Sequence, residues 1–126
     1  MKSLFFTATL LTLFLSSCSK NEDSGPIAPD TSAYEGTWKG SFEGDHDGPW
    51  TMYVTDHGTI SQTFVGISGP GTGSGTVTES GVLHIIHSTG AESMGQFNAE
   101  TGVVSGTWSL VNPTNNLSGS FYGTKQ

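Results

Sequence analysis

The side chains best suited to chemistry are acids and imidazoles gathered in two predicted turns. Asp45, His46 and Asp47 stand together, and Asp56 and His57 follow a few residues later. Carboxylates and imidazoles are ligands for divalent cations. The two groups bracket one predicted strand, so in an up-and-down barrel they lie at opposite ends and cannot share an ion. We therefore expect solvated turns and no metal site.

Two further histidines, His84 and His87, lie close together in the sequence. On a strand their odd spacing sends them to opposite faces, with His87 on the face of Leu83 and Ile85, near the strand end. Ser74 lacks the pattern of a nucleophile elbow, and the acids fall in turns rather than at the inward strand positions that glycoside chemistry needs. We expect no enzyme activity and no cofactor.

A glycine-rich run, Gly69–Gly75, invites comparison with phosphate-binding loops. No Lys follows it as in a P-loop, the G-x-G-x-x-G spacing is absent, and no helix begins after it. We predict a flexible loop here, a candidate lid or partner contact.

The elements that carry these residues are predicted to be short strands. From Tyr34 onward apolar residues alternate with Thr, Ser, Gly and Gln, and turn signals separate the segments. We expect an all-β domain, a small eight-stranded antiparallel up-and-down barrel, with a β-sandwich as the alternative. The predicted strands are 36–42, 49–55, 59–66, 73–78, 82–88, 93–98, 103–111 and 117–124.

Tight turns set the strand register. The turns 56–58 and 79–81 both end in Gly, which suits a type I turn followed by a left-handed residue. This geometry predicts the facing pairs Val54–Ile60, Met52–Gln62, Trp50–Phe64 and Val77–Leu83. Glycines within strands let a sheet curl and favour closure; they are Gly40, Gly95, Gly106 and Gly119.

Alternation also predicts which side chains fill the barrel. The expected inward set is Trp38, Phe42, Trp50, Met52, Val54, Ile60, Phe64, Val77, Leu83, Ile85, Phe97, Val104, Trp108, Leu110, Leu117 and Phe121. We expect a mostly filled interior or a shallow cleft at one mouth. The candidate ligand contacts are aromatic, because stacking suits neutral ligands; they are Trp50, Tyr53, Trp108 and Tyr122. Trp50 and Trp108 have core packing as their alternative role.

Composition limits the classes of partner. The chain has 126 residues, which suits one small domain, and its four basic residues are all Lys, against eleven Asp and Glu. Without Arg there is no planar fork to hold a carboxylate or phosphate. The segment 34–126 has eight acids and two Lys, a net charge of −6, which repels nucleic acid and anionic membranes. Neutral or cationic partners are favoured.

The first segment is typical of an export signal. Lys2 precedes an apolar run, Leu4–Leu15, whose 12 residues would rise about 18 Å as a helix, too little for a hydrocarbon core of about 30 Å. Leu15-Ser16-Ser17-Cys18 resembles the lipobox of bacterial lipoproteins. The resemblance implies cleavage before Cys18 and acylation of its thiol, with palmitate as a typical acyl chain. Cys18 is the only Cys, so no intrachain disulfide is possible.

These features divide the chain into three parts. Residues 1–17 are the expected lipoprotein signal peptide, residues 18–33 an acylated Cys and flexible linker poor in apolar side chains, and residues 34–126 the barrel domain. The acidic tract after Cys18 is similar to the export tract of some surface lipoproteins. The predicted location is the outer membrane, through the lipid anchor, on the cell surface or the periplasmic face.

Gly36-Thr37-Trp38 opens the first predicted strand and resembles the Gly-x-Trp motif of the calycins, the group of lipocalins and avidins. The resemblance implies that Trp38 plugs one end of an eight-stranded barrel. No match to the avidin ligand contacts is present, and the Arg clamp of fatty-acid-binding barrels has no counterpart. The resemblance therefore implies a fold and no particular ligand.

The sequence is compatible with two functions. The first is a lipid-anchored barrel that binds a small neutral or apolar ligand at its mouth. The alternative is an interaction or protease-inhibitor module that presents the Gly69–Gly75 loop and the Glu43–Gly48 turn to an envelope protein.

Overall fold

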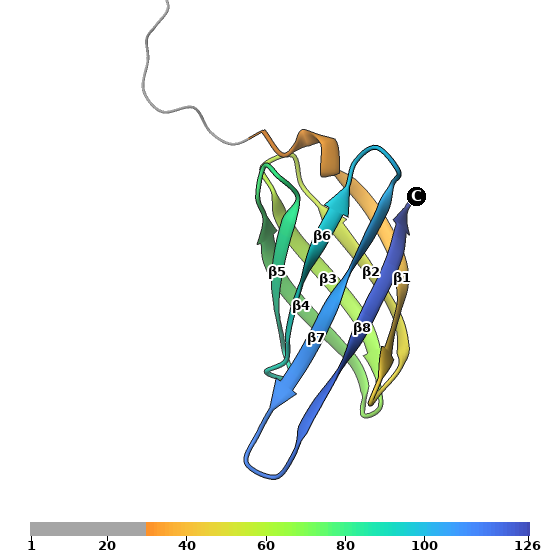
Figure 1. Ribbon diagram of the computed structural model, residues 1–126, viewed down its shortest axis with the longest axis vertical. Coiled ribbons are helices and arrows are strands. Elements are labelled where there is room, and N and C mark those ends of the chain that lie inside the picture. The colour runs from red at the N-terminus through yellow and green to blue at the C-terminus, as the bar shows by residue number, and fades with distance from the viewer. Residues whose placement is uncertain (1–29) are drawn as a thin grey trace, which may run out of the picture.

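Eight antiparallel strands, each hydrogen-bonded to the next in the sequence, close into a barrel where the last strand pairs with the first (Figure 1). The computed structural model describes residues 30–126. The strands are β1 Gly36–Gly44, β2 Gly48–Val54, β3 Thr59–Gly66, β4 Gly69–Val77, β5 Val82–His87, β6 Glu92–Asn98, β7 Val103–Val111 and β8 Asn116–Lys125. The predicted up-and-down barrel is confirmed, and the sandwich alternative is wrong. Within residues 30–126, no helix has the length and apolar character needed to cross a membrane.

The predicted strand register is also confirmed. Val54 faces Ile60 and Trp50 faces Phe64 across the β2–β3 hairpin, and Val77 faces Leu83 across β4–β5. The turn glycines behave as expected, since Gly58 has φ 83° and Gly81 has φ 92°. Side chains at these positions would be strained, so the two glycines hold both hairpins in register.

The predicted flexible loop Gly69–Gly75 is wrong, because these residues form the first seven positions of β4. They pair with β3 along its length, from Gly66–Gly69 onward. Glycine alternates here with Pro70, Thr72 and Ser74, so the strand presents small side chains outward and almost no side chain inward. The interaction-module alternative thereby loses one of the two loops it was expected to use.

The inward glycines of the barrel make room for aromatic rings on neighbouring strands. Five large aromatic residues each lie directly opposite a glycine, in the pairs Phe42–Gly48, Trp50–Gly40, Phe64–Gly71, Trp108–Gly119 and Phe121–Gly106. A methyl group on any of these glycines would meet the facing side chain at 2.4–3.1 Å, closer than carbon contacts allow. An eight-stranded barrel is only just wide enough for side chains. The glycine content is therefore what allows so many rings inside.

One end of the barrel is sealed. A short 3-10 helix, η1 Ser32–Tyr34, lies across it beside the fully buried Trp38. The Trp38 indole Nε1 donates to the backbone oxygen of Tyr34 at 2.9 Å, and its ring meets that of Phe97 edge-on at 4.6 Å between centroids. Lys125 Nζ lies 5.8 Å from the Trp38 ring centre. This position agrees with the plug that the calycin resemblance implies.

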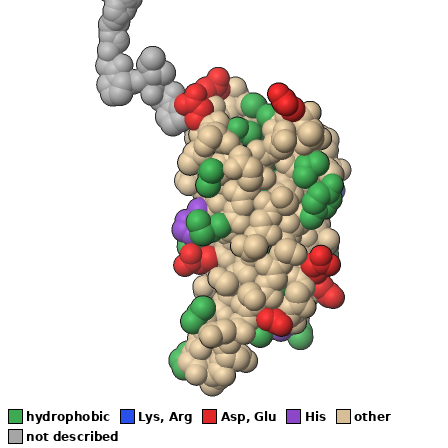
Figure 2. Space-filling model, viewed as in Figure 1, with side chains coloured by type: hydrophobic (Ala, Val, Ile, Leu, Met, Phe, Trp, Pro, Cys, Tyr) green, Lys and Arg blue, Asp and Glu red, His purple; other side chains and the backbone are tan. Residues whose placement is uncertain are grey.

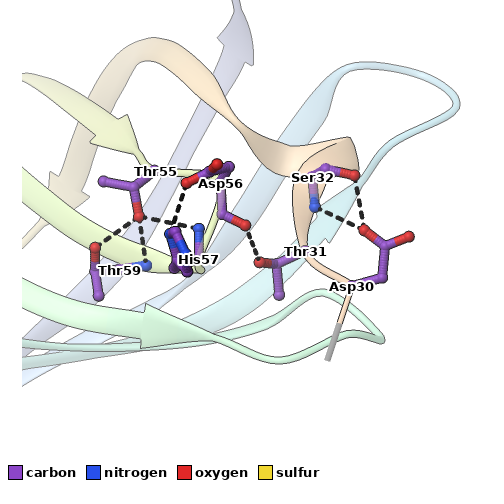
Figure 3. A network of polar contacts seen from close by, with 7 residues as sticks. All are labelled: Asp30, Thr31, Ser32, Thr55, Asp56, His57 and Thr59. Atoms are coloured by element: carbon purple, nitrogen blue, oxygen red, sulfur yellow. Dashed lines mark hydrogen bonds and ion pairs between the residues drawn. The ribbon is translucent and has the colours of Figure 1, made fainter. Parts of the chain in front are cut away.

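A polar network fastens the start of the described chain to the same end (Figure 3). Thr31, which is 2% exposed, donates through Oγ1 to the backbone oxygen of Asp56 at 3.1 Å. Asp30 accepts hydrogen bonds from the hydroxyl and backbone N–H of Ser32, and these lower the pKa of its carboxyl. Residues 30–33 thus contact the barrel at its sealed end.

Candidate functional site

The opposite end of the barrel contains a partly enclosed cavity. Its volume, counted as the space open to the centre of a water molecule, is about 70 Å³. It is lined by Phe42, Trp50, Gln62, Phe64, His87, Thr89, Ala91, Ser93, Trp108 and Phe121. These residues come from β1–β3, from β5 and β6 with the turn between them, and from β7 and β8, and most lie toward the strand ends remote from η1, so the cavity faces away from the sealed end. We call this end the mouth.

Aromatic rings form the walls of the cavity. Phe42 packs edge-on against Phe64, with 6.1 Å between ring centres, and against Trp108, with 6.0 Å. Trp108 is fixed in turn by a 3.1 Å hydrogen bond from Nε1 to the backbone oxygen of Glu43, and the His46 ring lies 6.4 Å from it. Rings held by their neighbours lose little freedom when a ligand packs against them.

One side of the cavity is polar. The ring nitrogen Nε2 of His87 and the hydroxyl of Ser93 are 2.7 Å apart. The remaining ring nitrogen, Nδ1, has no hydrogen-bond partner in the protein, and neither does Oε1 of Gln62. Both atoms lie beside Gly73, since a Cβ on that residue would be 2.8 Å from Nδ1 and 3.2 Å from Oε1. The two unpartnered atoms are therefore at most about 6 Å apart, on the side of the barrel where β4 has no side chain.

Burial sets the charge state of His87. Removal from water lowers the pKa of His87 below its usual value, because the protonated ring loses its hydration. The Phe64 ring lies edge-on to His87, with 5.3 Å between centres, and supplies no compensating charge. His87 is thus neutral at pH 7, with one ring nitrogen able to donate and the other able to accept.

A third buried polar atom is the indole N–H of Trp50. Its side chain is 3% exposed and its Nε1 has no partner in the protein. The ring lies over Gly40 and Gly123, a facing pair on β1 and β8, where the barrel closes. Buried polar groups are nearly always hydrogen-bonded, so three unpartnered ones on the lining of one cavity call for an explanation.

The structure divides the four predicted ligand contacts into two sets. Trp50 and Trp108 both line the cavity. Tyr53 and Tyr122 point outward from β2 and β8, and are 47% and 55% exposed. The alternation that sends Trp50 inward sends Tyr53 outward, so the four aromatics do not form one site.

Sequence reasoning placed His87 correctly and missed its polar neighbours. His87 faces inward and His84 outward, where Nε2 of His84 lies 3.1 Å from a Glu92 carboxylate oxygen. Gln62 and Ser93 were not singled out. The register that pairs Met52 with Gln62 was predicted, and it contained the signal that an amide points inward.

The other candidate clusters lead to no site among the described residues. The turns that hold Asp45 and Asp56 lie at opposite ends, as expected. Asp45 accepts a 2.9 Å hydrogen bond from the backbone of Ser118, and Asp56 pairs with the exposed His57 at 2.7 Å. Within residues 30–126, no three His, Cys, Asp or Glu side chains come together to hold a metal.

A second hollow lies on the outer wall over β2–β4. It measures about 320 Å³ and is lined by Pro49, Trp50, Thr51, Thr63, Phe64, Val65, Pro70, Gly71 and Thr72. It has no titratable side chain and is more open than the cavity. Elsewhere on the surface, Figure 2 shows acidic side chains toward both ends of the barrel and apolar ones in small separate groups.

No protein-family model matches the chain, and no curated protein matches it. The predicted signal peptide, Cys18 and most of the predicted linker lie outside the described residues.

Proposed function

We propose that the protein is a lipid-anchored barrel that binds a small neutral or apolar ligand through its mouth. The observation that carries the proposal is the cavity itself. Rings held in place line its walls, and buried polar atoms without protein partners lie in its lining. Concave, mostly apolar pockets with a few convergent polar groups are the usual form of small-molecule sites.

We propose binding without catalysis. Ser93 and His87 are spaced as a nucleophile and a base would be, but Nδ1 of His87 has no carboxylate to orient it. His87 is also the only titratable residue in the lining of this cavity. The groups present suit recognition of an uncharged molecule better than acid–base chemistry.

The anchor and the location are part of the same proposal. The sequence Leu15-Ser16-Ser17-Cys18 supports acylation at Cys18, and two acyl chains hold a protein stably on a membrane. The described chain begins at the sealed end, where Thr31 is fastened. A protein tethered from that end to the outer membrane would present its mouth away from the lipid, toward the periplasm or the exterior.

Binding is tested on the chain from residue 18 on, carrying Cys18→Ser, which includes the whole closed barrel. Toluene and phenol serve as apolar and neutral polar probes, followed by the indole N–H resonances in NMR spectra. We expect the Trp50 and Trp108 signals to shift and that of Trp38, at the sealed end, to stay.

A pair of variants locates the binding. Ala91 is 8% exposed and lines the cavity, so Ala91→Phe should fill it and weaken binding of both probes at least tenfold. Met94→Phe adds a ring on the exposed outer face of β6 and should change nothing. Equal binding by the Ala91→Phe protein, or no binding of either probe, would refute the proposal.

The anchor is tested separately in a Gram-negative bacterium that expresses the full chain. We expect the protein in the outer-membrane fraction, with an intact mass that includes acyl chains on Cys18. Cys18→Ser should release it to the soluble fraction. An unmodified Cys18 in membrane-bound protein would contradict this part of the proposal and leave ligand binding untouched.

A further inference from the structure

We infer that the cavity selects an uncharged ligand that carries a hydrogen-bond donor, either a hydroxyl or a primary amide, on a small apolar body. Gln62 is the residue that accepts the hydrogen bond from this donor. The inference rests on the proposed binding function and specifies its chemistry. It starts from Gln62, which is 7% exposed on β3 and whose Oε1 has no partner in the protein.

With its acceptor oxygen on the Gly73 side, Gln62 needs a donor in either tautomer of the neighbouring histidine. If Ser93 donates to Nε2 of His87, the proton of the neutral ring is on Nδ1, and a hydroxyl can accept from Nδ1 and donate to Oε1. If Nε2 donates to Ser93, Nδ1 accepts, and the two hydrogens of an amide can serve both atoms. In both cases Oε1 needs a hydrogen, which a methyl group or a carboxylate cannot supply.

The amide is able to turn toward a ligand because no hydrogen bond within the protein holds its Oε1. In the free barrel Oε1 has almost no exposed surface and faces Gly73 at the edge of the cavity. Turning the Gln62 side chain toward the cavity breaks no hydrogen bond that Oε1 makes within the protein. The ligand's hydrogen bond is therefore gained without the loss of an existing protein one, and it offsets the penalty of a buried acceptor left unpaired.

Charge excludes the ionised alternatives. A carboxylate on the polar side of the cavity would meet Oε1 and a neutral His87, and the described chain has no cation there, since Lys39 lies on the outer side of β1 and Lys125 at the sealed end. Glu43 near the end of β1 and Asp45 and Asp47 in the turn that follows would repel it at the mouth, beside Trp108. Binding of a cationic ligand is also disfavoured, because no carboxylate lines the cavity to pair with its buried charge.

The test compares phenol, toluene and benzoate, three probes of one ring that differ in the group on it. Gln62→Leu removes the acceptor and keeps the volume, and replacing an unpaired buried amide by an apolar side chain should not destabilise the barrel. We expect phenol binding to weaken about tenfold and toluene binding to stay or strengthen, since one hydrogen bond contributes about that factor. Benzoate should bind at least tenfold more weakly than phenol to the parent chain.

Gln96→Leu is the matched control, because Gln96 lies on the outer face of β6 and bonds to backbone oxygens near the sealed end. It should leave the phenol-to-toluene ratio of dissociation constants unchanged. A second readout needs no variant: the ¹⁵N shifts of the His87 ring should move with phenol and hardly with toluene.

The outcomes separate the two proposals. If toluene and phenol bind and Gln62→Leu weakens neither, or if benzoate binds as well as phenol, the inference is overturned while ligand binding stands. If neither probe binds, the proposed function fails and the inference with it. Loss of phenol binding alone in Gln62→Leu, with the ¹⁵N response of His87, supports the inference.

Discussion

Gly71→Ala should destabilise the barrel through one side chain. A Cβ at Gly71 would lie 2.4 Å from Cζ of Phe64 and 2.8–2.9 Å from two more ring atoms, and its three nearest atoms all belong to that ring. Carbon atoms pack at about 3.5–4.0 Å, so the ring would have to move by about 1 Å or more. It cannot do so freely, because Phe42 and His87 pack edge-on against it.

The expected loss follows from this overpacking. Inserting a methyl into a well-packed core costs about 1–3 kcal/mol. For a domain of about 100 residues, each kcal/mol lowers the melting temperature by roughly 4–8 °C. Thermal unfolding followed by circular dichroism should therefore show a midpoint about 5–20 °C below that of the parent chain.

Gly66→Ala is the matched control on the same hairpin. Its Cβ would lie 3.5 Å from Cε2 of the same Phe64 ring, an ordinary contact, and Gly66 has no positive φ. Gly→Ala at such a site stabilises by about 0.4–1 kcal/mol by restricting the unfolded chain. The two substitutions should thus have opposite signs.

A smaller ring partner should rescue the clash. Phe64→Leu in the Gly71→Ala background should recover at least about 1 kcal/mol relative to the sum of the single changes. If Gly71→Ala is as stable as Gly66→Ala, or if Phe64→Leu brings no recovery, the rings do not need the glycines and the account of the barrel interior is wrong.

Three further results are expected. Because the folded barrel disfavours protonated His87, the unfolded chain takes up the proton more readily, and stability falls as the pH drops from about 6.5 through the lower folded pKa; in denaturant titrations at several pH values His87→Leu should reduce this fall. Thr31→Val should lose about 1 kcal/mol of stability in the same assay, because it removes the bond to Asp56, and Thr31→Ser should keep it. The parent chain should release nitrophenol from short acyl esters no faster than Ser93→Ala; a faster rate would contradict binding without catalysis.

The alternation of apolar and polar residues along the sequence made most of the fold predictable. This alternation, from Tyr34 onward, indicated which side chains face inward, and Gly58 and Gly81 indicated the positions of two hairpins. The pairing of Trp50 with Phe64 could therefore be predicted from the sequence alone. Closure was supported by glycines within strands. These are local signals, and local signals suffice in a barrel whose strands pair in sequence order.

The site was harder to predict because it depends on depth along the barrel axis. Trp50 and Tyr53 are equally aromatic, and alternation separates them, but it does not show that Trp50 lies at a cavity. Gln62 faces inward by the same rule that governs Ile60. Its missing partner becomes visible only when β4, β5 and β6 are placed around it.

The prediction that failed concerns β4, the strand beside which Phe64, Gln62 and His87 pack. Composition marks Gly69–Gly75 as a loop, since glycine weakens an isolated strand, yet here the strand lies between β3 and β5 and is paired on both sides. Its inward glycines leave room for side chains of the neighbouring strands. Phe64 lies over Gly71, and Gln62 and His87 lie beside Gly73. Side chains at these positions would occupy the space that those three residues now fill, and would push them into the cavity. The run that resembles a flexible lid is therefore a wall of the barrel, and its lack of side chains is what lets polar residues pack inside the barrel next to the aromatic ones.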